Sequence, residues 1–404
     1  MFLSRPMLAV SAALLASCTS LPSDNSYEAA PIERGDGPGA MALFPVLEAE
    51  AERDENVFIS PLSIELAFGL LHAGARGETR AQIERFLPPP EDPLGFEVEG
   101  DDVTVAVSNA LFLDEAFRFR PEYLRATERV YEAQAIGVDF ARKQDSADTI
   151  NAWADEATRG MIPQVISPPA ITDDMIALLA NALYFEALWQ TELDRDSEHF
   201  FLFGNGSRKP FKFVGESFET RYAKLGDWEA VRLPYRGERF VMDIVMPDEQ
   251  RVMTQAPTLD FVARTKAALD AADPRLVKVE IPQFEIDFGQ SLKPPLIDMG
   301  LGLPFTSQAD LTGIAEPGQQ PIKVGDVQHI TKLQVYDEGT KAAAVTTISI
   351  VVTGARIEPK GAIPFRADRP FIVVIRDLER DAVLFIGRIS DPQPFEPEVD
   401  EGEF

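Results

Sequence analysis

The chain has 404 residues, 45% of them hydrophobic, which is enough to bury a large core. It carries 66 acidic residues against 38 basic ones, a formal net charge of -28. This balance excludes nucleic acid as a partner, because a duplex requires clustered Lys and Arg side chains to neutralise its phosphates. The single cysteine excludes an intramolecular disulfide.

The first 17 residues have the layout of an export signal. Arg5 precedes an apolar run from Met7 to Ala16, which is too short to span a bilayer. The residues Leu15-Ala-Ser-Cys18 resemble the lipobox of bacterial lipoproteins, in which the signal is cut before the cysteine and its sulfur is acylated. We therefore expect a signal peptide over 1–17 and a lipid on Cys18, with an incidental cysteine as the alternative.

The remaining chain divides into three parts by composition. Residues 18–39 are rich in Ser, Pro, Gly and acidic residues and are expected to form a flexible tether. Residues 40–393 contain no linker-like break and no internal repeat, so we expect one folded domain there. Residues 394–404 contain acidic but no basic side chains and are expected to be a solvated tail.

The first third of the folded part is predicted to be mostly helical. Ser60 is a candidate N-cap, because Pro61 follows at the first helical position and an apolar stripe follows Pro61. Thr79 is a second candidate N-cap, for a helix that the prolines at 88–90 end. A further helix is expected from Asn151 to Ile162.

The second half is predicted to consist mainly of strands. Val231–Tyr235 and Phe240–Met246 flank a short turn and indicate a hairpin. Val277, Val279 and Ile281 alternate with polar residues, and 371–375 and 383–386 indicate a buried hairpin near the C-terminus. Helices followed by mostly antiparallel strands predict an α+β fold.

The segment from Val335 to Ala355 has no helical period. Its alternate residues are small or apolar, as one buried face of a strand requires, and they are Thr340, Ala342, Ala344, Thr346, Ile348, Ile350 and Val352. An ordinary central strand has the same period. However, the run of alanines beside Glu338-Gly339-Thr340 is unusual for such a strand, because Ala and Gly are poor strand formers.

Several motifs, in family order from about residue 44 to 392, resemble those of the serpin family. Val324–His329, followed by Asp337–Ala344, is similar to the serpin approach strand and hinge. Further similar segments are Asn56–Ile64, Ile150–Trp153 with Thr158–Gly160, Asn181–Phe185 with Trp189, Phe365–Phe371 and Leu384–Gly387. Three departures from the family pattern are Pro45 in the expected first helix, Ala187 in place of Gly, and a large Val345 in the hinge.

The resemblance implies a serpin fold, with helices packed on a large mixed or antiparallel central sheet, smaller sheets and an exposed reactive-centre loop. It also implies an irreversible inhibitor of serine proteases. Cleavage of the loop forms an acyl-enzyme, and the freed segment then inserts into the central sheet and distorts the protease. Small hinge residues suit insertion, and the implied hinge is Glu338, Gly339, Thr340, Ala342, Ala343 and Ala344. The implied shutter, a polar cluster beneath the sheet, is Ser60, Ser63, Asn181 and His329.

Serpin loops usually place the cleaved bond about fifteen residues into the segment that starts at the hinge glycine. This count implies Thr353-Gly354, which suits elastase-like or subtilisin-like proteases with shallow primary pockets. A count backwards from Pro370 favours Arg356-Ile357 instead, which would attract trypsin-like proteases. Both bonds remain candidates.

We expect a monomer that forms covalent complexes with serine proteases and touches a membrane only through its N-terminal lipid. It would then lie outside the cytoplasm, on the bacterial cell envelope. No catalytic residue, metal site or cofactor is expected, because the three His residues form no nucleophile–base motif. The alternative is a non-inhibitory serpin that acts as a carrier or chaperone-like protein, for which an obstructed hinge would be typical.

Overall fold

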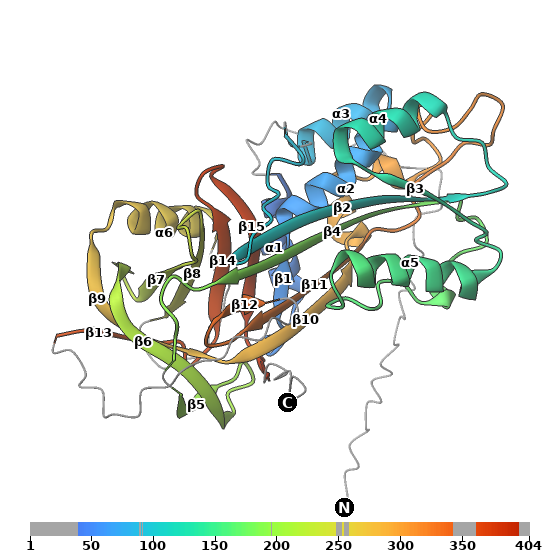
Figure 1. The fold of residues 1–404 in the computed structure, drawn as a ribbon. Helices are drawn as coiled ribbons and strands as arrows, with labels where there is room; N and C mark the ends of the chain where they lie inside the picture. The colour runs from blue at the N-terminus through green and yellow to red at the C-terminus, as the bar shows by residue number, and fades with distance from the viewer. Residues whose placement is uncertain are drawn as a thin grey trace, which may run out of the picture.

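The computed structural model describes residues 39–88, 90, 92–194, 196–247, 253, 258–341 and 361–395. They form two large β-sheets with helices packed against both, which confirms the predicted α+β class (Figure 1). The helices are α1 (Leu43–Glu50), α2 (Pro61–Gly74), α3 (Gly77–Phe86), α4 (Pro121–Tyr131), α5 (Lys143–Ala157), α6 (Leu259–Ala271) and α7 (Lys293–Asp298), with short 3-10 turns at Gly39–Ala42, Pro168–Ala170 and Leu303–Phe305. None of the helices in these ranges combines the length and apolar character needed to cross a bilayer.

The seven-stranded sheet has the order β16-β10-β11-β12-β4-β2-β3. Only the β2–β3 pair is parallel, so the sheet is mixed, which is one of the two arrangements that the serpin resemblance implied. Its strands are β2 (Val103–Asp114), β3 (Gln134–Val138), β4 (Ala177–Leu188), β10 (Phe284–Ser291), β11 (Gln328–Val335), β12 (Gly339–Lys341) and β16 (Gln393–Pro394).

The nine-stranded sheet has the order β1-β15-β14-β8-β7-β6-β9-β13, and β5 pairs with β6 beside this path. Both predicted hairpins, β7–β8 and β14–β15, are confirmed here. The strands are β1 (Val57–Ile59), β5 (Ser197–Leu202), β6 (Arg208–Leu225), β7 (Trp228–Pro234), β8 (Phe240–Pro247), β9 (Pro274–Pro282), β13 (Ile363–Arg366), β14 (Phe371–Asp377) and β15 (Ala382–Ile389).

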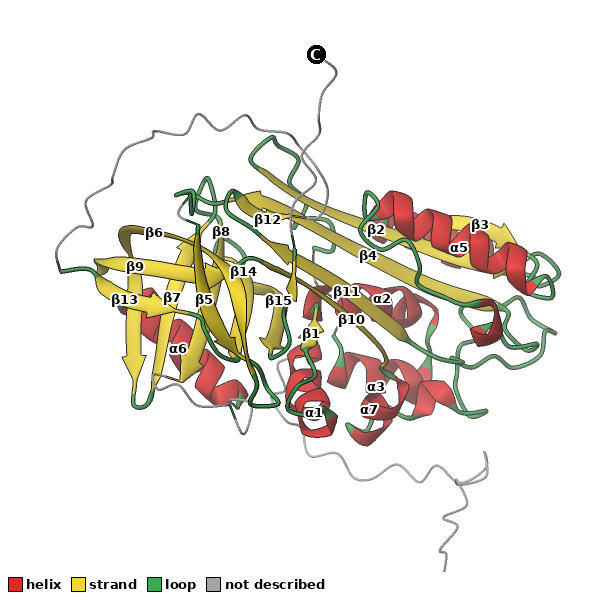
Figure 2. Cartoon of the chain, turned by 90° about the horizontal axis from the view of Figure 1, so that it is seen from below, coloured by secondary structure: helices red, strands yellow, loops and turns green. Residues whose placement is uncertain are grey.

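The helices form layers on the two sheets. Figure 1 shows α2, α3 and α4 on one face of the seven-stranded sheet, and both Figure 1 and Figure 2 show α5 on the opposite face. Helix α2 contacts both β4 and β15, so it lies where the two sheets meet. Helix α6 covers the nine-stranded sheet, where Phe261 packs against Trp228 with ring centroids 5.1 Å apart.

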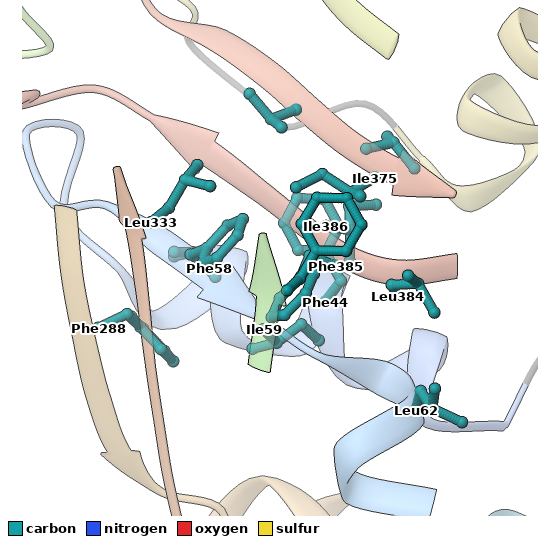
Figure 3. Packing of buried hydrophobic residues seen from close by; sticks show 14 of the residues in the cluster. Phe44, Phe58, Ile59, Leu62, Phe288, Leu333, Ile375, Leu384, Phe385 and Ile386 are labelled. Carbon is teal, nitrogen blue, oxygen red and sulfur yellow. The ribbon is translucent and has the colours of Figure 1, made fainter. Parts of the chain in front are cut away.

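The core is continuous between the two sheets. Phe58 of β1 stacks on Phe385 of β15, with ring centroids 5.4 Å apart and the planes 1° from parallel. Figure 3 shows these rings beside Phe44 of α1 and Leu333 of β11. All four side chains are less than 6% exposed. The middle of the seven-stranded sheet therefore packs against a close-packed apolar core.

Two of the predicted helix limits are wrong. Thr79 is not an N-cap, because α3 begins at Gly77 and the Thr79 hydroxyl accepts a hydrogen bond of 2.8 Å from the distant backbone N–H of Asp310. The helix expected over 151–162 is α5, which begins earlier and ends at Ala157. It ends there because Arg159 and Gly160 both have positive φ angles, which a right-handed helix does not tolerate.

The Ser60 N-cap is confirmed. Its side chain accepts a hydrogen bond of 3.1 Å from the backbone N–H of Ser63, and Pro61 occupies the first helical position. Pro45 is also accommodated, because it lies in the first turn of α1, where a backbone N–H has no partner within the helix.

Candidate functional site

A groove runs through the seven-stranded sheet between β4 and β11. One edge of β4 pairs with β2 from Ala177 to Ala187, but the other edge pairs only at Ala187 and Leu188, with β12. In the same way, β11 pairs with β10 along its length and with β12 at only two residues. Beyond β12, no strand of the described chain lies between the two edges, and a cavity of about 720 Å³ occupies this place.

The cavity has the character of a missing strand position. Its walls are mainly apolar and come from both strands, with Leu179, Leu183 and Phe185 on β4 and Leu333 on β11. A strand interior normally has its backbone N–H and C=O groups paired on both sides. The arrangement therefore offers two facing rows of hydrogen-bonding groups and an apolar floor to an additional strand.

His329 and the start of α2 meet beneath this groove. The backbone N–H of Ser60 donates a hydrogen bond of 3.1 Å to Nε2 of His329, so the imidazole is neutral and carries its proton on Nδ1. Burial lowers the pKa of His329 to about 4. Ser63 belongs to the same cluster through its bond to the Ser60 hydroxyl. Three of the four predicted shutter residues therefore lie together.

Asn181 lies on β4, the opposite wall of the groove. Its side-chain amide donates to Oδ1 of Asn109 at 3.0 Å and to the carbonyl of Ser108 at 3.4 Å. Its own Oδ1 is buried and has no hydrogen-bond partner among the described residues. The predicted shutter thus spans the groove, with His329 on one wall, Asn181 on the other, and an acceptor left without a donor.

The first part of the predicted hinge already lies between the two strands. Gly339 pairs with Leu188, and Thr340 pairs with Ala187 on one side and Val335 on the other. A side chain at position 339 would not fit, because a Cβ there would lie 2.3 Å from the carbonyl oxygen of Ala187. Glycine at position 339 is therefore required by close backbone approach.

The turn before β12 is held by the segment that follows β4. The carbonyl of Glu338 accepts from the backbone N–H of Trp189 at 2.8 Å, and that of Asp337 accepts from Leu193 at 2.9 Å. The indole Nε1 of Trp189 donates to the carbonyl of Tyr336 at 3.0 Å. The reversal from β11 to β12 is consequently fixed at three points.

Sequence reasoning missed Tyr235, which lies directly under the hinge. Its hydroxyl shares a hydrogen bond of 2.8 Å with the Thr340 hydroxyl, and both side chains are buried. Burial raises the pKa of the Tyr235 phenol well above its ordinary value, so the group stays neutral. No sequence signal could have found this contact, because the two residues are 105 positions apart, with Tyr235 directly after β7 and Thr340 in β12 of the other sheet.

The other predicted site residues lie outside the described residues. They are the hinge residues Ala342, Ala343 and Ala344, both candidate bonds, Thr353-Gly354 and Arg356-Ile357, and the lipidation residue Cys18. Their roles stay predictions.

Neither a metal-binding cluster nor a serine activated by His329 is found in the described part of the chain. It contains no group of three or more His, Cys, Asp or Glu side chains arranged to bind a metal ion. His329 accepts its hydrogen bond from a backbone N–H, so it does not activate the Ser60 hydroxyl as a nucleophile. The polar groups of the groove are positioned for packing and strand pairing.

Comparison with known proteins identifies the family. The family described as Serpin (serine protease inhibitor) matches residues 39–392. The leukocyte elastase inhibitor of Bos taurus is 32% identical over 376 residues, covering 87% of this chain and 97% of that protein. Iripin-8 of Ixodes ricinus is 31% identical over 355 residues, covering 83% and 88%. The chain belongs to the serpin family.

A solved structure with the same fold is that of uncleaved ovalbumin. It superimposes with a TM-score of 0.74 at 22% sequence identity, covering 86% of this chain and 95% of ovalbumin. At this identity the likeness shows the fold alone. The family is described as one of serine protease inhibitors and not of enzymes, which agrees with the prediction that the chain is not an enzyme.

Proposed function

We propose that this chain irreversibly inhibits serine proteases by inserting its cleaved reactive-centre loop between β4 and β11. The observation that carries the proposal is the groove between these strands, which β12 already enters at one end. The segment that follows β12 in the chain has the alternating small and apolar residues that a new central strand requires.

Continuing the register of β12 brings the predicted shutter residues opposite one position of the inserted strand. Thr340 pairs with Ala187 and Val335, so Ala344 would pair with Leu183 and Thr331. Two residues further, Thr346 would stand between Asn181 and His329. A threonine hydroxyl there would supply a donor to the Oδ1 of Asn181, which has no partner among the described residues.

The chemistry of capture follows from serine protease action. The protease serine oxygen adds to the carbonyl carbon before the cleaved bond, the C–N bond breaks, and the proton ends on the leaving amine. An ester then links the loop to the protease, and insertion carries the protease away before water hydrolyses the ester. Burial of Ile348, Ile350 and Val352 contributes about 1.5–3 kcal/mol each. Loss of one oxyanion-hole donor costs a protease about 2.7–4 kcal/mol, so insertion supplies sufficient free energy.

We propose Thr353-Gly354 as the cleaved bond and elastase-like or subtilisin-like enzymes as targets. The name of the leukocyte elastase inhibitor, which is 32% identical, favours the same class. Arg356-Ile357 is the second candidate bond and would direct the chain to trypsin-like enzymes. We further propose that the inhibitor acts as a monomer.

The test combines three proteases with two matched variants. The purified protein is mixed with elastase, subtilisin or trypsin and resolved on a denaturing gel, and the released C-terminal peptide is identified by mass spectrometry. We expect a covalent complex and a peptide that starts at Gly354, whereas a start at Ile357 would move the target to trypsin-like enzymes. Cleavage without complex by all three would favour the non-inhibitory alternative.

The matched variants are Ala344→Glu and Ala343→Glu. Residue 344 would face the groove floor and 343 the outer face, by the alternation of a strand. A buried, unpaired carboxylate is costly, so Ala344→Glu should be cleaved without complex formation while Ala343→Glu still forms it. Equal complex formation by both variants would contradict insertion in this register.

We also propose that the protein is anchored to the bacterial cell envelope through a lipid on Cys18. The proposal rests on the lipobox-like residues and the signal layout. Metabolic labelling with a radioactive or clickable fatty acid should label the wild-type protein and not Cys18→Ser. Equal labelling of the wild-type protein and of Cys18→Ser would contradict the proposal that Cys18 carries the lipid.

A further inference from the structure

The hydrogen bond between Tyr235 and Thr340 joins the first inward-facing residue of β12 to the hairpin of the nine-stranded sheet. The two hydroxyl oxygens are 2.8 Å apart. Tyr235 is 0% exposed and Thr340 is 2% exposed, so water does not compete for this bond. A buried hydroxyl that loses its partner costs more than an exposed one.

The phenol of Tyr235 is held in one orientation. Its ring stacks on Trp189 with centroids 4.5 Å apart and planes 10° from parallel, and the edge of Phe185 packs on it at 5.2 Å. The Trp189 indole is itself fixed by the carbonyl of Tyr336. The hydroxyl of Tyr235 is therefore a preorganised hydrogen-bonding group at the end of the groove that β12 occupies.

This hydrogen bond is important because β12 is short and pairs with its neighbouring strands at few positions. The strand comprises only Gly339–Lys341, and each neighbouring strand pairs with it at two positions. Gly339 contributes no side chain. Among the described side chains of β12, that of Thr340 therefore holds the strand in its register.

We propose that Tyr235 is a positioning residue for strand insertion, whose hydroxyl holds Thr340 between β4 and β11 before the loop is cleaved. The freed segment then continues a strand whose first residues are already in register. This inference rests on the proposed function, because it assigns Tyr235 a part in the same insertion.

The first experiment measures amide hydrogen exchange in the uncleaved full chain, and it needs no protease. In Tyr235→Phe the ring and its stacking remain, but the hydroxyl is lost. We expect the amides of 339–341 to exchange about fivefold to tenfold faster, as loss of one buried hydrogen bond implies. Thr340→Val should have the same effect and Thr340→Ser a smaller one, and the double variant Tyr235→Phe/Thr340→Val should add little further.

The control is Tyr222→Phe, which also removes a phenol hydrogen bond. The hydroxyl of Tyr222 on β6 donates to the carboxylate of Glu229 on β7 at 3.1 Å. Exchange at 339–341 should not change in this variant. Unchanged exchange in both Tyr235→Phe and Thr340→Val would overturn the inference.

The second experiment counts the inhibitor molecules consumed for each protease molecule inactivated. Tyr235→Phe should raise this number severalfold while the rate of loop cleavage stays the same, because only insertion is impaired. If the amides of 339–341 exchange faster in Tyr235→Phe but the number of inhibitor molecules consumed for each protease molecule does not change, Tyr235 has no role in insertion. If the wild-type chain forms no complex with any protease, the proposed function fails, and the exchange experiment still decides whether Tyr235 holds the hinge.

Discussion

The backbone N–H of Ser60 donates a hydrogen bond of 3.1 Å to Nε2 of His329, across 269 positions of the chain. Ser60 is 0% exposed and His329 is 5% exposed. The bond ties the start of α2 to the strand that forms one wall of the groove. The same imidazole is thus both a structural acceptor and the group that Thr346 would approach on insertion.

Protonation of His329 should destabilise the protein at low pH. Burial lowers its pKa from 6.5 to about 4, so between these values the unfolded chain binds a proton that the folded chain does not. Stability is then lost as pH falls through this window. We expect about 2 kcal/mol less free energy of unfolding from this group at pH 5 than at pH 7.5, measured by denaturant titration.

The variant His329→Gln isolates this contribution, because its side-chain oxygen can accept from Ser60 but does not titrate. The difference between wild type and variant should shrink or reverse at pH 5. The comparison is needed because burial raises the pKa of Glu65 to about 6, which changes stability with the opposite sign. If the difference in free energy of unfolding between wild type and His329→Gln is the same at pH 5 and at pH 7.5, the pH dependence does not come from His329.

Replacement of Gly339 by Ala should disrupt the docked hinge. The added Cβ would lie 2.3 Å from the carbonyl oxygen of Ala187, so β12 must move away from β4. Such overpacking costs about 1–3 kcal/mol. On a denaturing gel with a reactive protease, the variant should give more cleaved inhibitor and less complex than wild type.

The control for this substitution is Gly289→Ala in β10 of the same sheet. A Cβ there would meet only Ile330, at an ordinary distance of 3.5 Å. It should leave the proportions of complex and cleaved inhibitor unchanged. If both variants behave like wild type, close approach at 339 does not limit insertion.

Removal of the Asp243 charge should strongly destabilise the fold. Asp243 accepts hydrogen bonds of 2.7 and 2.9 Å from Arg232 and of 3.1 Å from Arg376, and all three side chains are buried. Asp243→Asn leaves two buried guanidinium groups with less compensation, which should lower the free energy of unfolding by about 3–5 kcal/mol.

The matched control is Asp260→Asn on α6. Asp260 pairs with Arg264 at 3.0 Å, but the two side chains are 78% and 63% exposed. Its loss should change the free energy of unfolding by less than about 1 kcal/mol. Similar effects of the two substitutions would show that burial does not govern the energetics of these pairs.

Loss of the Ser60 hydroxyl should weaken α2 at its first turn. In Ser60→Ala the buried backbone N–H of Ser63 loses its acceptor, while the Ser60 N–H to His329 remains. An N-cap of this kind contributes about 0.5–2 kcal/mol, so thermal unfolding should occur at a lower temperature. Thr258→Ala removes the equivalent cap of the exposed α6 start and should cost less. A larger loss of stability in Thr258→Ala than in Ser60→Ala would contradict a role for burial.

The local elements follow from the sequence because their signals are local. The Ser60-Pro61 start of α2 and the β7–β8 hairpin involve side chains only a few positions apart, so cap and turn chemistry predicts them. The alternation after Gly339 likewise indicates a strand with one small, apolar face. These features, with the serpin resemblance, predict the fold class and the place of the hinge.

Tertiary structure decides what lies opposite these elements. The sequence does not bring Tyr235 under Thr340, assign the Thr79 hydroxyl to the backbone of Asp310, or place Asn181 across the groove from His329. The residues of each pair are more than 100 positions apart, and their placement depends on how the two sheets pack and where the strands of one sheet separate. Local preferences carry no information about such distances, whereas close packing of a shared core fixes them.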